Sequence, residues 1–401
     1  MRLLKHLFKR AVRKGTLRVY DADGGLHAFV GEPAEPVVTM RLHDKTLYHS
    51  LFLNGKLTLG EAYTDGTLTF EEGSGVHDFL NLLVQNQASV ATHPMLKTVN
   101  RLNRFLKPLQ QMNPIGKAQK NVAHHYDLSA RLYELFLDED RQYSCAYFCT
   151  EEDTLEVAQD NKKRLLAAKL ALQSGQKILD IGCGWGGLSL FIAQQADVEV
   201  LGVTLSREQH AIATERAQAM GLADRVRFEL MDYRLVDQKF DRIVSVGMFE
   251  HVGVSHYDEF FAKMKALLAD DGVAVVHSIG RSCPPGSLSP WIHKYIFPGA
   301  YSPALSEVFP HVENNGLWVS DLEILRIHYA KTLMEWYRRF IDNRSEIAAL
   351  YDEKFCRMWE FYLLSVETSF RYGAGMVFQM QLTNQASTLP LTRRYILDAA
   401  G

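Results

Sequence analysis

The chain has 401 residues, of which 47% are hydrophobic and 23% charged, and its formal net charge is −3. This length suits roughly two or three domains with a large core, and the composition is ordinary for a soluble globular protein. The charge argues against a general nucleic-acid-binding protein, which is usually basic. No apolar run reaches the length of a transmembrane helix. The five scattered cysteines argue against a disulfide framework and favour the cytoplasm.

The N-terminal region predicts a small α+β domain over residues 1–92. Its first fourteen residues interleave cations with Leu4 and Phe8 at helical spacing, which is typical of a helix lying on an anionic membrane or packed on its own domain. Residues 15–70 predict short strands, and Val76–Val90 predicts a helix. Turn signals in this region are Asp23-Gly24-Gly25, Asn54-Gly55 and Asp65-Gly66.

A polar and basic stretch with three prolines, residues 93–120, predicts a linker to a second domain at 121–401. In that domain Asp153 and Glu156 have capping-box spacing and predict a helix to about Leu172. Strands and helices then alternate, which indicates a parallel sheet covered on both faces. The predicted strands are Lys177–Asp180, Val198–Val203, Val226–Met231, Asp241–Val246, Val273–His277, Trp318–Ile327 and, as a last edge strand, Met376–Leu382.

A glycine-rich loop follows the first of these strands. Gly182, Gly184 and Gly187 match a dinucleotide-binding pattern, which alone is a weak signal. A dinucleotide fold also needs an acidic residue at the tip of the second strand, to hold a ribose hydroxyl. Here that strand ends at Thr204. Asp180 precedes the loop, and Asp232-Tyr233 after the third strand suits an adenine ring, so S-adenosylmethionine is favoured over NAD.

Two ionisable residues stand where ligands bind in open α/β sheets, at the carboxyl ends of strands. Glu250 follows the fourth strand and His277 closes the fifth, and their pairing on neighbouring strands favours a site over a core histidine. His251 is interpreted as structural. No metal is expected, because His124-His125 has no spaced partner and Cys145 and Cys149 have no second pair.

Together these residues resemble the cyclopropane fatty acid synthases, relatives of the mycolic acid cyclopropane synthases. The resemblance covers residue 121 to the C-terminus, and Leu59–Gly66 resembles the N-terminal domain of the branch that acts on phospholipids. The motifs that carry it are His125–Leu128, Gln142–Tyr147, Leu179–Gly187, Gly202–Ser206 with Gln209, Phe240–Gly253, Trp291–Pro298 and Thr332–Tyr337.

The resemblance implies a Rossmann-like, class I S-adenosylmethionine-dependent methyltransferase fold with a seven-stranded sheet and a smaller N-terminal lipid-binding domain. It also implies methyl transfer to a cis double bond of a phospholipid acyl chain, with ring closure and bicarbonate as the base. The implied bicarbonate pocket is Cys145, Glu250, His277, Tyr329 and the backbone of Ile279. The implied cofactor contacts are Tyr143, Ser144, Asp180, Gly182, Gly184, Gly186, Thr204, Leu205, Gln209, Asp232 and Tyr233.

The sequence leaves open which product is formed and whether the protein is an enzyme. The same chemistry could give a methylene or methyl-branched chain, and a non-catalytic lipid carrier is a further possibility that the intact pocket disfavours. The family implies a homodimer. An acyl substrate favours a cytoplasmic enzyme held peripherally on the inner membrane by local basic patches, and the N-terminal helix is a candidate for one of them.

Overall fold

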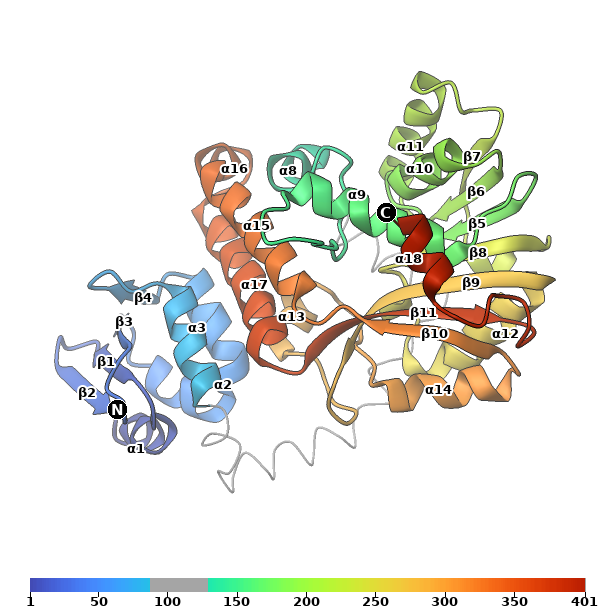
Figure 1. Cartoon of the computed structure of the whole chain (residues 1–401). Coiled ribbons are helices and arrows are strands. Elements are labelled where there is room, and N and C mark those ends of the chain that lie inside the picture. Colours follow the sequence, from blue (N-terminus) through green and yellow to red (C-terminus); the bar gives the residue numbers. More distant parts are fainter. Residues whose placement is uncertain (87–128, 401) are drawn as a thin grey trace. The chain divides into compact units, whose positions relative to one another are not determined.

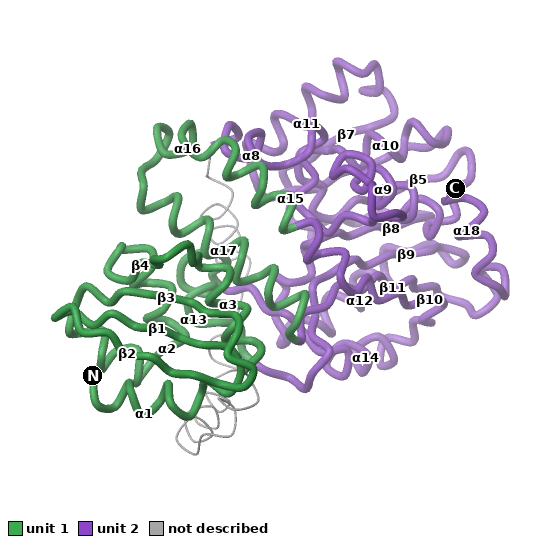
Figure 2. Tube along the Cα trace, turned by 60° about the vertical axis from the view of Figure 1, so that its left-hand side comes forward, with its two compact units in different colours: residues 1–107, 287–298, 333–373 green, residues 108–286, 299–332, 374–401 purple. Residues whose placement is uncertain are grey.

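The computed structural model describes residues 1–86 and 129–400 (Figure 1). The predicted linker, the His124-His125 pair and the end of the helix predicted to reach Val90 lie outside these residues. Two compact units make up the chain (Figure 2). Unit 1 consists of Met1–Lys107, Ser287–Pro298 and Leu333–Gly373, and unit 2 of Pro108–Gly286, Gly299–Thr332 and Ala374–Gly401.

Unit 2 is built on a seven-stranded sheet with the strand order β10-β11-β9-β8-β5-β6-β7. The strands from β9 to β7 pair in parallel, whereas β11 pairs antiparallel with both β9 and β10. The predicted fold class, an α/β sheet of seven strands, is therefore confirmed. Its strands are β5 (Lys177–Ile181), β6 (Glu199–Thr204), β7 (Val226–Leu230), β8 (Phe240–Val246), β9 (Leu268–Arg281), β10 (Trp318–Ile324) and β11 (Gly375–Thr383).

Helices cover both faces of this sheet. The core on one face joins the sheet to α9, α10 and α11, and the core on the other joins it to α12 and α14. The helices of unit 2 are α8 (Ala130–Phe136), α9 (Leu155–Leu170), α10 (Gly187–Gln195), α11 (Arg207–Ala219), α12 (Tyr257–Leu267), α14 (Leu305–Asn314), α18 (Arg394–Ala400), the short 3-10 turns η1 (Tyr233–Leu235), η2 (Phe249–His251) and η3 (Val254–His256), and the first turn of α15 (His328–Asp342).

Two details of unit 2 correct the predictions. The cap of α9 is Thr154, whose hydroxyl accepts from Val157 N at 3.3 Å, whereas Asp153 accepts from the Cys149 and Thr150 amides. The strand β11 is not at the edge, because it lies between β9 and β10 and eight of its nine residues are buried. A position with partners on both sides leaves no free ladder groups, and that is why β11 can be buried along nearly its whole length.

Unit 1 contains a four-stranded sheet with the order β2-β1-β3-β4. The turn predicted at Asp23-Gly24-Gly25 is confirmed, and it forms the connection between the antiparallel strands β1 and β2. The strands are β1 (Thr16–Tyr20), β2 (Leu26–Val30), β3 (Val37–Leu42) and β4 (Leu68–Glu71). The helices are α1 (Arg2–Ala11), α2 (Leu47–Thr64), α3 (Val76–Gln85), α13 (Pro290–Tyr295), α16 (Arg344–Leu350), α17 (Glu353–Tyr372) and α15 from Leu333 onward.

The expectation of strands throughout residues 15–70 is wrong for α2. The Asn54-Gly55 turn signal falls inside this helix, where Asn54 leaves the helical conformation with φ −141° and ψ 53°. Two family motifs meet here, since a Cβ on Gly60 of α2 would lie 2.5 Å from the Trp291 ring of α13. Beside it the Glu61 carboxylate accepts from Lys294 Nζ and the Tyr295 hydroxyl, each at 2.8 Å. The buried contact of Gly60 with Trp291 and the more exposed contacts of Glu61 therefore join the two motifs within unit 1.

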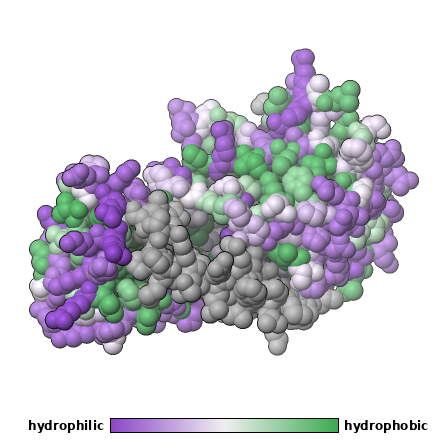
Figure 3. Space-filling view, turned by 90° about the horizontal axis from the view of Figure 1, so that it is seen from below, coloured by the Kyte–Doolittle hydropathy of each residue, from purple (hydrophilic) through white to green (hydrophobic). Residues whose placement is uncertain are grey.

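The apolar side of α1 is used by unit 1 itself. Leu4 and Phe8 belong to the core that contains β1, β3, α2 and α3. The cations of the same segment remain exposed at Lys9, Arg10, Arg13 and Lys14. Figure 3 shows one face of the molecule, on which hydrophilic side chains predominate and apolar ones form small groups. No helix in the described ranges has the length and apolarity that a membrane span needs.

Candidate active site

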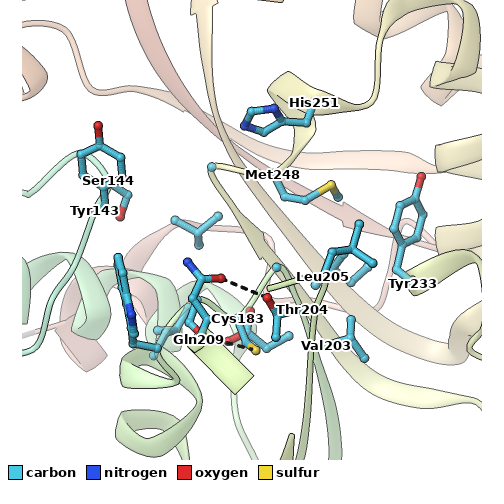
Figure 4. Close-up of a pocket in the computed structure, with 18 of the residues that line it drawn as sticks. Tyr143, Ser144, Cys183, Val203, Thr204, Leu205, Gln209, Tyr233, Met248 and His251 are labelled. Atoms are coloured by element: carbon cyan, nitrogen blue, oxygen red, sulfur yellow. Dashed lines mark hydrogen bonds between the residues drawn. The ribbon is translucent and has the colours of Figure 1, made fainter. Parts of the chain in front are cut away.

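A pocket lies where the carboxyl ends of β5, β6 and β8 meet the glycine loop and the segment before α9 (Figure 4). Ligands bind at this edge in open parallel sheets, because the loops after the strands converge there. Ten of the eleven predicted cofactor residues line the pocket: Tyr143, Ser144, Asp180, Gly182, Gly184, Thr204, Leu205, Gln209, Asp232 and Tyr233.

The glycine loop needs glycine for its backbone. Gly182, Gly184 and Gly186 have φ values of 82°, 56° and 82°, a region that other residues rarely adopt. Gly186 is the one predicted cofactor residue that does not line the pocket. A Cβ there would lie 2.6 Å from Phe228 Cζ, so Gly186 allows the start of α10 to approach β7 closely.

Asp180, the second-to-last residue of β5, is a buried acid in the pocket wall. Its Oδ2 accepts from Ser189 Oγ on α10 at 2.7 Å, and its exposed fraction is 2%. Burial raises the pKa of Asp180 to about 6, although the Ser189 hydrogen bond and the charge of Lys162 lower it. The side chain is therefore fixed before any ligand arrives, and it offers an acceptor for an ammonium group.

The ends of β6 and β7 supply the opposite wall. Thr204 donates from Oγ1 to Gln209 Oε1 at 3.0 Å, as Figure 4 shows. Asp232 accepts from Arg234 Nε at 2.9 Å and from Arg234 Nη2 at 2.7 Å. Burial raises the pKa of Asp232, but the hydrogen bonds and charge of Arg234 outweigh it and the net pKa is lowered. Asp232 is thus an ionised acceptor next to the Tyr233 ring.

The Tyr143–Ser144 side of the pocket rests on a buried lysine. Lys162 of α9, with an exposed fraction of 0%, donates to Ser144 Oγ at 2.8 Å and also to Gln142. Gln159, one turn earlier, donates to the Ser144 carbonyl at 3.0 Å. Burial lowers the pKa of Lys162 to about 8. The conformation of this loop is therefore set by α9.

Sequence reasoning missed part of the pocket. His251 was interpreted as structural, yet it lines the cavity, and burial lowers its pKa to about 4. The Trp185 indole also lines the cavity, and its Nε1–H is buried without a hydrogen-bond partner among the described residues. The position of Trp185 inside the glycine loop was a usable signal. Further lining residues not predicted include Arg141, Gln142, Met231, Met248 and His256.

Glu250 lies at the border of this pocket, one residue before His251. Its Oε1 accepts from the Ile279 amide at 2.6 Å, so the Ile279 backbone expected in the site is engaged by Glu250. Its Oε2 is buried and has no partner among the described residues. Burial raises the pKa of Glu250 to about 7, although the Ile279 hydrogen bond lowers it. This leaves one buried carboxyl oxygen available to a ligand.

His277 and Cys145 are also buried at the border, and neither lines the cofactor pocket. The His277 carbonyl accepts from the amide of Gly247, a lining residue, at 2.9 Å, and Cys145 directly follows Ser144. Burial and the charges of Lys162 and Lys169 hold the pKa of His277 well below its usual range. Burial also raises the pKa of the Cys145 thiol. Both groups are therefore uncharged near neutral pH.

Tyr329 completes the predicted set from the first turn of α15. Thr332, one turn later on the same helix, accepts from Ala146 N at 3.0 Å, so this face of α15 packs on the chain beside Cys145. Tyr329 itself is buried. Of the aromatic residues near these motifs, Phe249 belongs to the core, where its ring stacks on Tyr257 at 4.4 Å.

Within residues 1–86 and 129–400, no group of three or more His, Cys, Asp or Glu side chains could hold a metal ion. The site consists instead of the pocket at the carboxyl ends of the strands, bordered by the uncharged buried groups of His277 and Cys145 and by the Glu250 carboxyl group.

A seven-stranded sheet with this glycine loop, a buried acid near the end of β5 and an acidic–aromatic pair after β7 defines an S-adenosylmethionine-dependent methyltransferase. The family described as mycolic acid cyclopropane synthetase matches residues 115–380. The chain belongs to this family.

Individual relatives agree. The chain is 37% identical over 332 residues to the cyclopropane-fatty-acyl-phospholipid synthase of Escherichia coli K12, covering 83% of this chain and 84% of that protein. It is 32% identical over 399 residues to the tuberculostearic acid methyltransferase UfaA1 of Mycobacterium tuberculosis, covering 96% and 91%. The crystal structure of the mycolic acid cyclopropane synthase CmaA1 complexed with SAH and CTAB matches with a TM-score of 0.64 at 35% identity, covering 68% and 99%.

Proposed function

We propose that this enzyme converts the cis double bond of an unsaturated phospholipid acyl chain into a cyclopropane ring, with bicarbonate as the base. The observation that carries the proposal is the Glu250 carboxyl, which is buried at the border of the cofactor pocket with Oε2 unpartnered. A buried polar atom without a partner is costly, and it points to a ligand that supplies the missing hydrogen bond.

The surrounding groups fit a small anion. His277 is neutral and Cys145 is a thiol, so neither repels negative charge, and each can donate a hydrogen bond. Tyr329 offers a hydroxyl from α15. Glu250, with a pKa of about 7, keeps its proton part of the time and can share it with an anion oxygen. Bicarbonate, which has one donor and several acceptor lone pairs, matches this mixed set.

The chemistry requires little activation of the acceptor. An alkene is a weak nucleophile with no proton to remove first, and S-adenosylmethionine, when bound, supplies an electrophilic methyl group. Positive charge then develops on the acyl chain, and closing the ring requires loss of a proton from the new methyl group. Bicarbonate, when bound, supplies a base for that proton. Glu250 contributes negative charge at that place, and burial of the surrounding groups keeps out water that would trap the cation.

The direct test is to express the chain in a bacterial host that lacks cyclopropane lipids and to analyse its fatty acids. We expect a mass gain of one methylene group on monounsaturated chains, with ring protons in the NMR spectrum of the product. A host that carries the empty vector serves as the control. Folded, cofactor-bound protein that leaves the fatty acids unchanged would sink the proposal and favour a lipid carrier.

A second product is favoured by one observation. The relative that spans 96% of this chain is a tuberculostearic acid methyltransferase, so similarity at this level includes a relative that is not named as a cyclopropane synthase. The cation could then lose its proton without ring closure, which gives a methylene-branched chain or a methyl-branched chain that keeps a double bond. The same lipid analysis separates the outcomes, because a mass gain without ring protons identifies the branched product.

We also propose peripheral binding to the cytoplasmic face of the inner membrane through the exposed cations of the N-terminal segment. Since Leu4 and Phe8 are buried in unit 1, α1 would act by charge rather than by inserting its apolar side. Reversing Lys9, Arg10 and Arg13 should weaken binding to anionic vesicles by about 1 kcal/mol per residue at low salt. Reversing Lys177, Arg207 and Arg227 of unit 2, which are also exposed, is the matched control. Equal binding by both variants contradicts the proposal.

We also propose that the chain forms a homodimer. Light scattering of the purified chain tests this, because it measures the mass of the particle in solution.

A further inference from the structure

A row of polar side chains crosses three strands of the unit 2 sheet. Glu323 on β10 stands directly opposite Gln379 on β11, and Gln379 stands directly opposite His277 on β9. Opposite residues in antiparallel strands point to the same face. Gln379 is fully buried, and the exposed fraction of His277 is 3%. The row therefore leads from the edge strand to the candidate anion site.

Lys169 of α9 lies over this row. Its Nζ donates to Glu323 Oε2 at 2.6 Å and to Gln379 Oε1 at 2.7 Å, and Asp321 Oδ2 is 4.0 Å away. Its exposed fraction is 0%. Gln381, two residues after Gln379, donates to the Lys169 carbonyl and to the Tyr395 hydroxyl, which fixes the end of α9. The lysine is thus held from several directions.

The direction of each hydrogen bond follows from the lysine. An ammonium group can only donate, so the Gln379 atom facing it must be the carbonyl oxygen. The amide nitrogen of Gln379 then faces His277 Nδ1, at 3.1 Å, and it donates there. A neutral imidazole whose Nδ1 accepts must carry its proton on Nε2.

We propose that Lys169 and Gln379 are positioning residues that present His277 to the anion site as a neutral imidazole with its proton on Nε2. The inference rests on the proposed function in one respect, namely that His277 contributes a donor to the bound anion. Lys169 fixes the amide, the amide fixes the tautomer, and the tautomer decides whether His277 can donate. Without these hydrogen bonds the proton could equally lie on Nδ1, and Nε2 would then present a lone pair that repels an anion.

The decisive variant is Gln379→Glu, which keeps the size of the side chain and removes its donor. A carboxylate beside Nδ1 can only accept, so the His277 proton moves to Nδ1. The tautomer is read from the ¹⁵N chemical shifts of histidine in ¹⁵N-His-labelled enzyme, with the His277 signals assigned by their loss in His277→Gln. We expect an Nε2–H tautomer in the wild type and an Nδ1–H form in Gln379→Glu.

Lys169→Met tests the first link. It removes the cation that orients the amide, while Glu323 keeps Arg393 as a partner at 3.1 Å. We expect the two tautomers of His277 to mix. In both variants we expect turnover to fall by about 10²- to 10³-fold, the effect of losing one preorganised donor. S-adenosylmethionine affinity should change by less than about three-fold, because neither residue lines the cofactor pocket.

Gln381→Glu is the matched control, since it places a carboxylate on the same strand near Lys169 without touching His277. It should retain the wild-type tautomer. An Nδ1–H tautomer in wild-type enzyme, or a tautomer unchanged in both Gln379→Glu and Lys169→Met with cofactor affinity intact, overturns the proposal. If wild-type enzyme forms no ring or branched product, the proposed function fails, and the NMR spectra still decide the tautomer.

Discussion

Replacing Glu250 by Gln should make the protein more stable at alkaline pH while it removes most activity. The carboxyl group ionises near 4.5 when solvated, but burial raises its pKa to about 7 in the fold. Between these values the unfolded chain has lost the proton and the folded chain keeps it, so wild-type stability falls as pH rises. Since one pKa unit corresponds to about 1.4 kcal/mol, the full effect is about 3 kcal/mol.

Glutamine cannot ionise, so Glu250→Gln should escape this loss. Its unfolding free energy, compared with the wild type, should increase by about 3 kcal/mol between about pH 4 and pH 8. The test compares how the unfolding free energy of each protein changes with pH, because any pH-independent effect of the amide on stability cancels in that change. Urea unfolding at several pH values measures it, with Glu215→Gln, an exposed carboxylate on α11, as control. If the unfolding free energies of Glu250→Gln and the wild type change with pH in parallel, the raised pKa of Glu250 is refuted.

The same variant separates chemistry from cofactor binding. The amide oxygen can still accept from the Ile279 amide, so η2 should keep its position. Glu250 does not line the cofactor pocket, and S-adenosylmethionine affinity by calorimetry should change less than about three-fold. Turnover should fall about 10²- to 10³-fold, the usual cost of one preorganised group in an active site. Loss of cofactor binding would show that Glu250 has a different role.

Three further variants test the pocket and its scaffold. Tyr233→Leu should weaken S-adenosylmethionine binding by about 1–3 kcal/mol, the value of an aromatic ring stacked on a base, and calorimetry measures it. Asp180→Asn should weaken it at least about tenfold through loss of a charge-assisted hydrogen bond, with circular dichroism confirming the fold. Gly186→Ala should destabilise unit 2 more than Gly175→Ala in denaturant unfolding, since both glycines have φ 82° but only Gly186 would bring a Cβ within 2.6 Å of Phe228. The backbone strain costs about 1–2 kcal/mol in each variant, and the overpacking adds about 1–3 kcal/mol to Gly186→Ala alone; equal losses would contradict this.

The sequence predicted the sheet and most of the residues that line the pocket because their signals are local. A buried strand, a glycine turn and a helix start lie within twenty residues around Gly184, and the acid–aromatic pair follows one strand end. The helix α2 was missed because its middle contains Asn54-Gly55, a strong turn signal, and because packing against the unit 1 core overrides it.

The rest depends on pairings between distant segments. The β11 strand was placed at the edge because nothing in its sequence shows that β10 lies outside it. The position of β11 between β9 and β10 brings Gln379 beside His277, which is 102 residues away in the sequence. It also brings Gln379 beside Lys169, which is 210 residues away. Each of these residues looks ordinary in its own segment. Only the register of three strands and the helix above them shows that they form one chain of hydrogen bonds.

The helix α9 supports both halves of the site. Lys162 and Lys169 are seven residues apart and therefore lie on one helix face. The first fixes Ser144 in the cofactor pocket and the second fixes Gln379 beside His277, and both ammonium groups lower the pKa of that histidine. A buried ammonium carries a desolvation cost that an apolar side chain of similar volume avoids. The two buried lysines are therefore explained by the groups they orient rather than by stability, and α9 positions both the Ser144 loop of the pocket and the polar row beside His277.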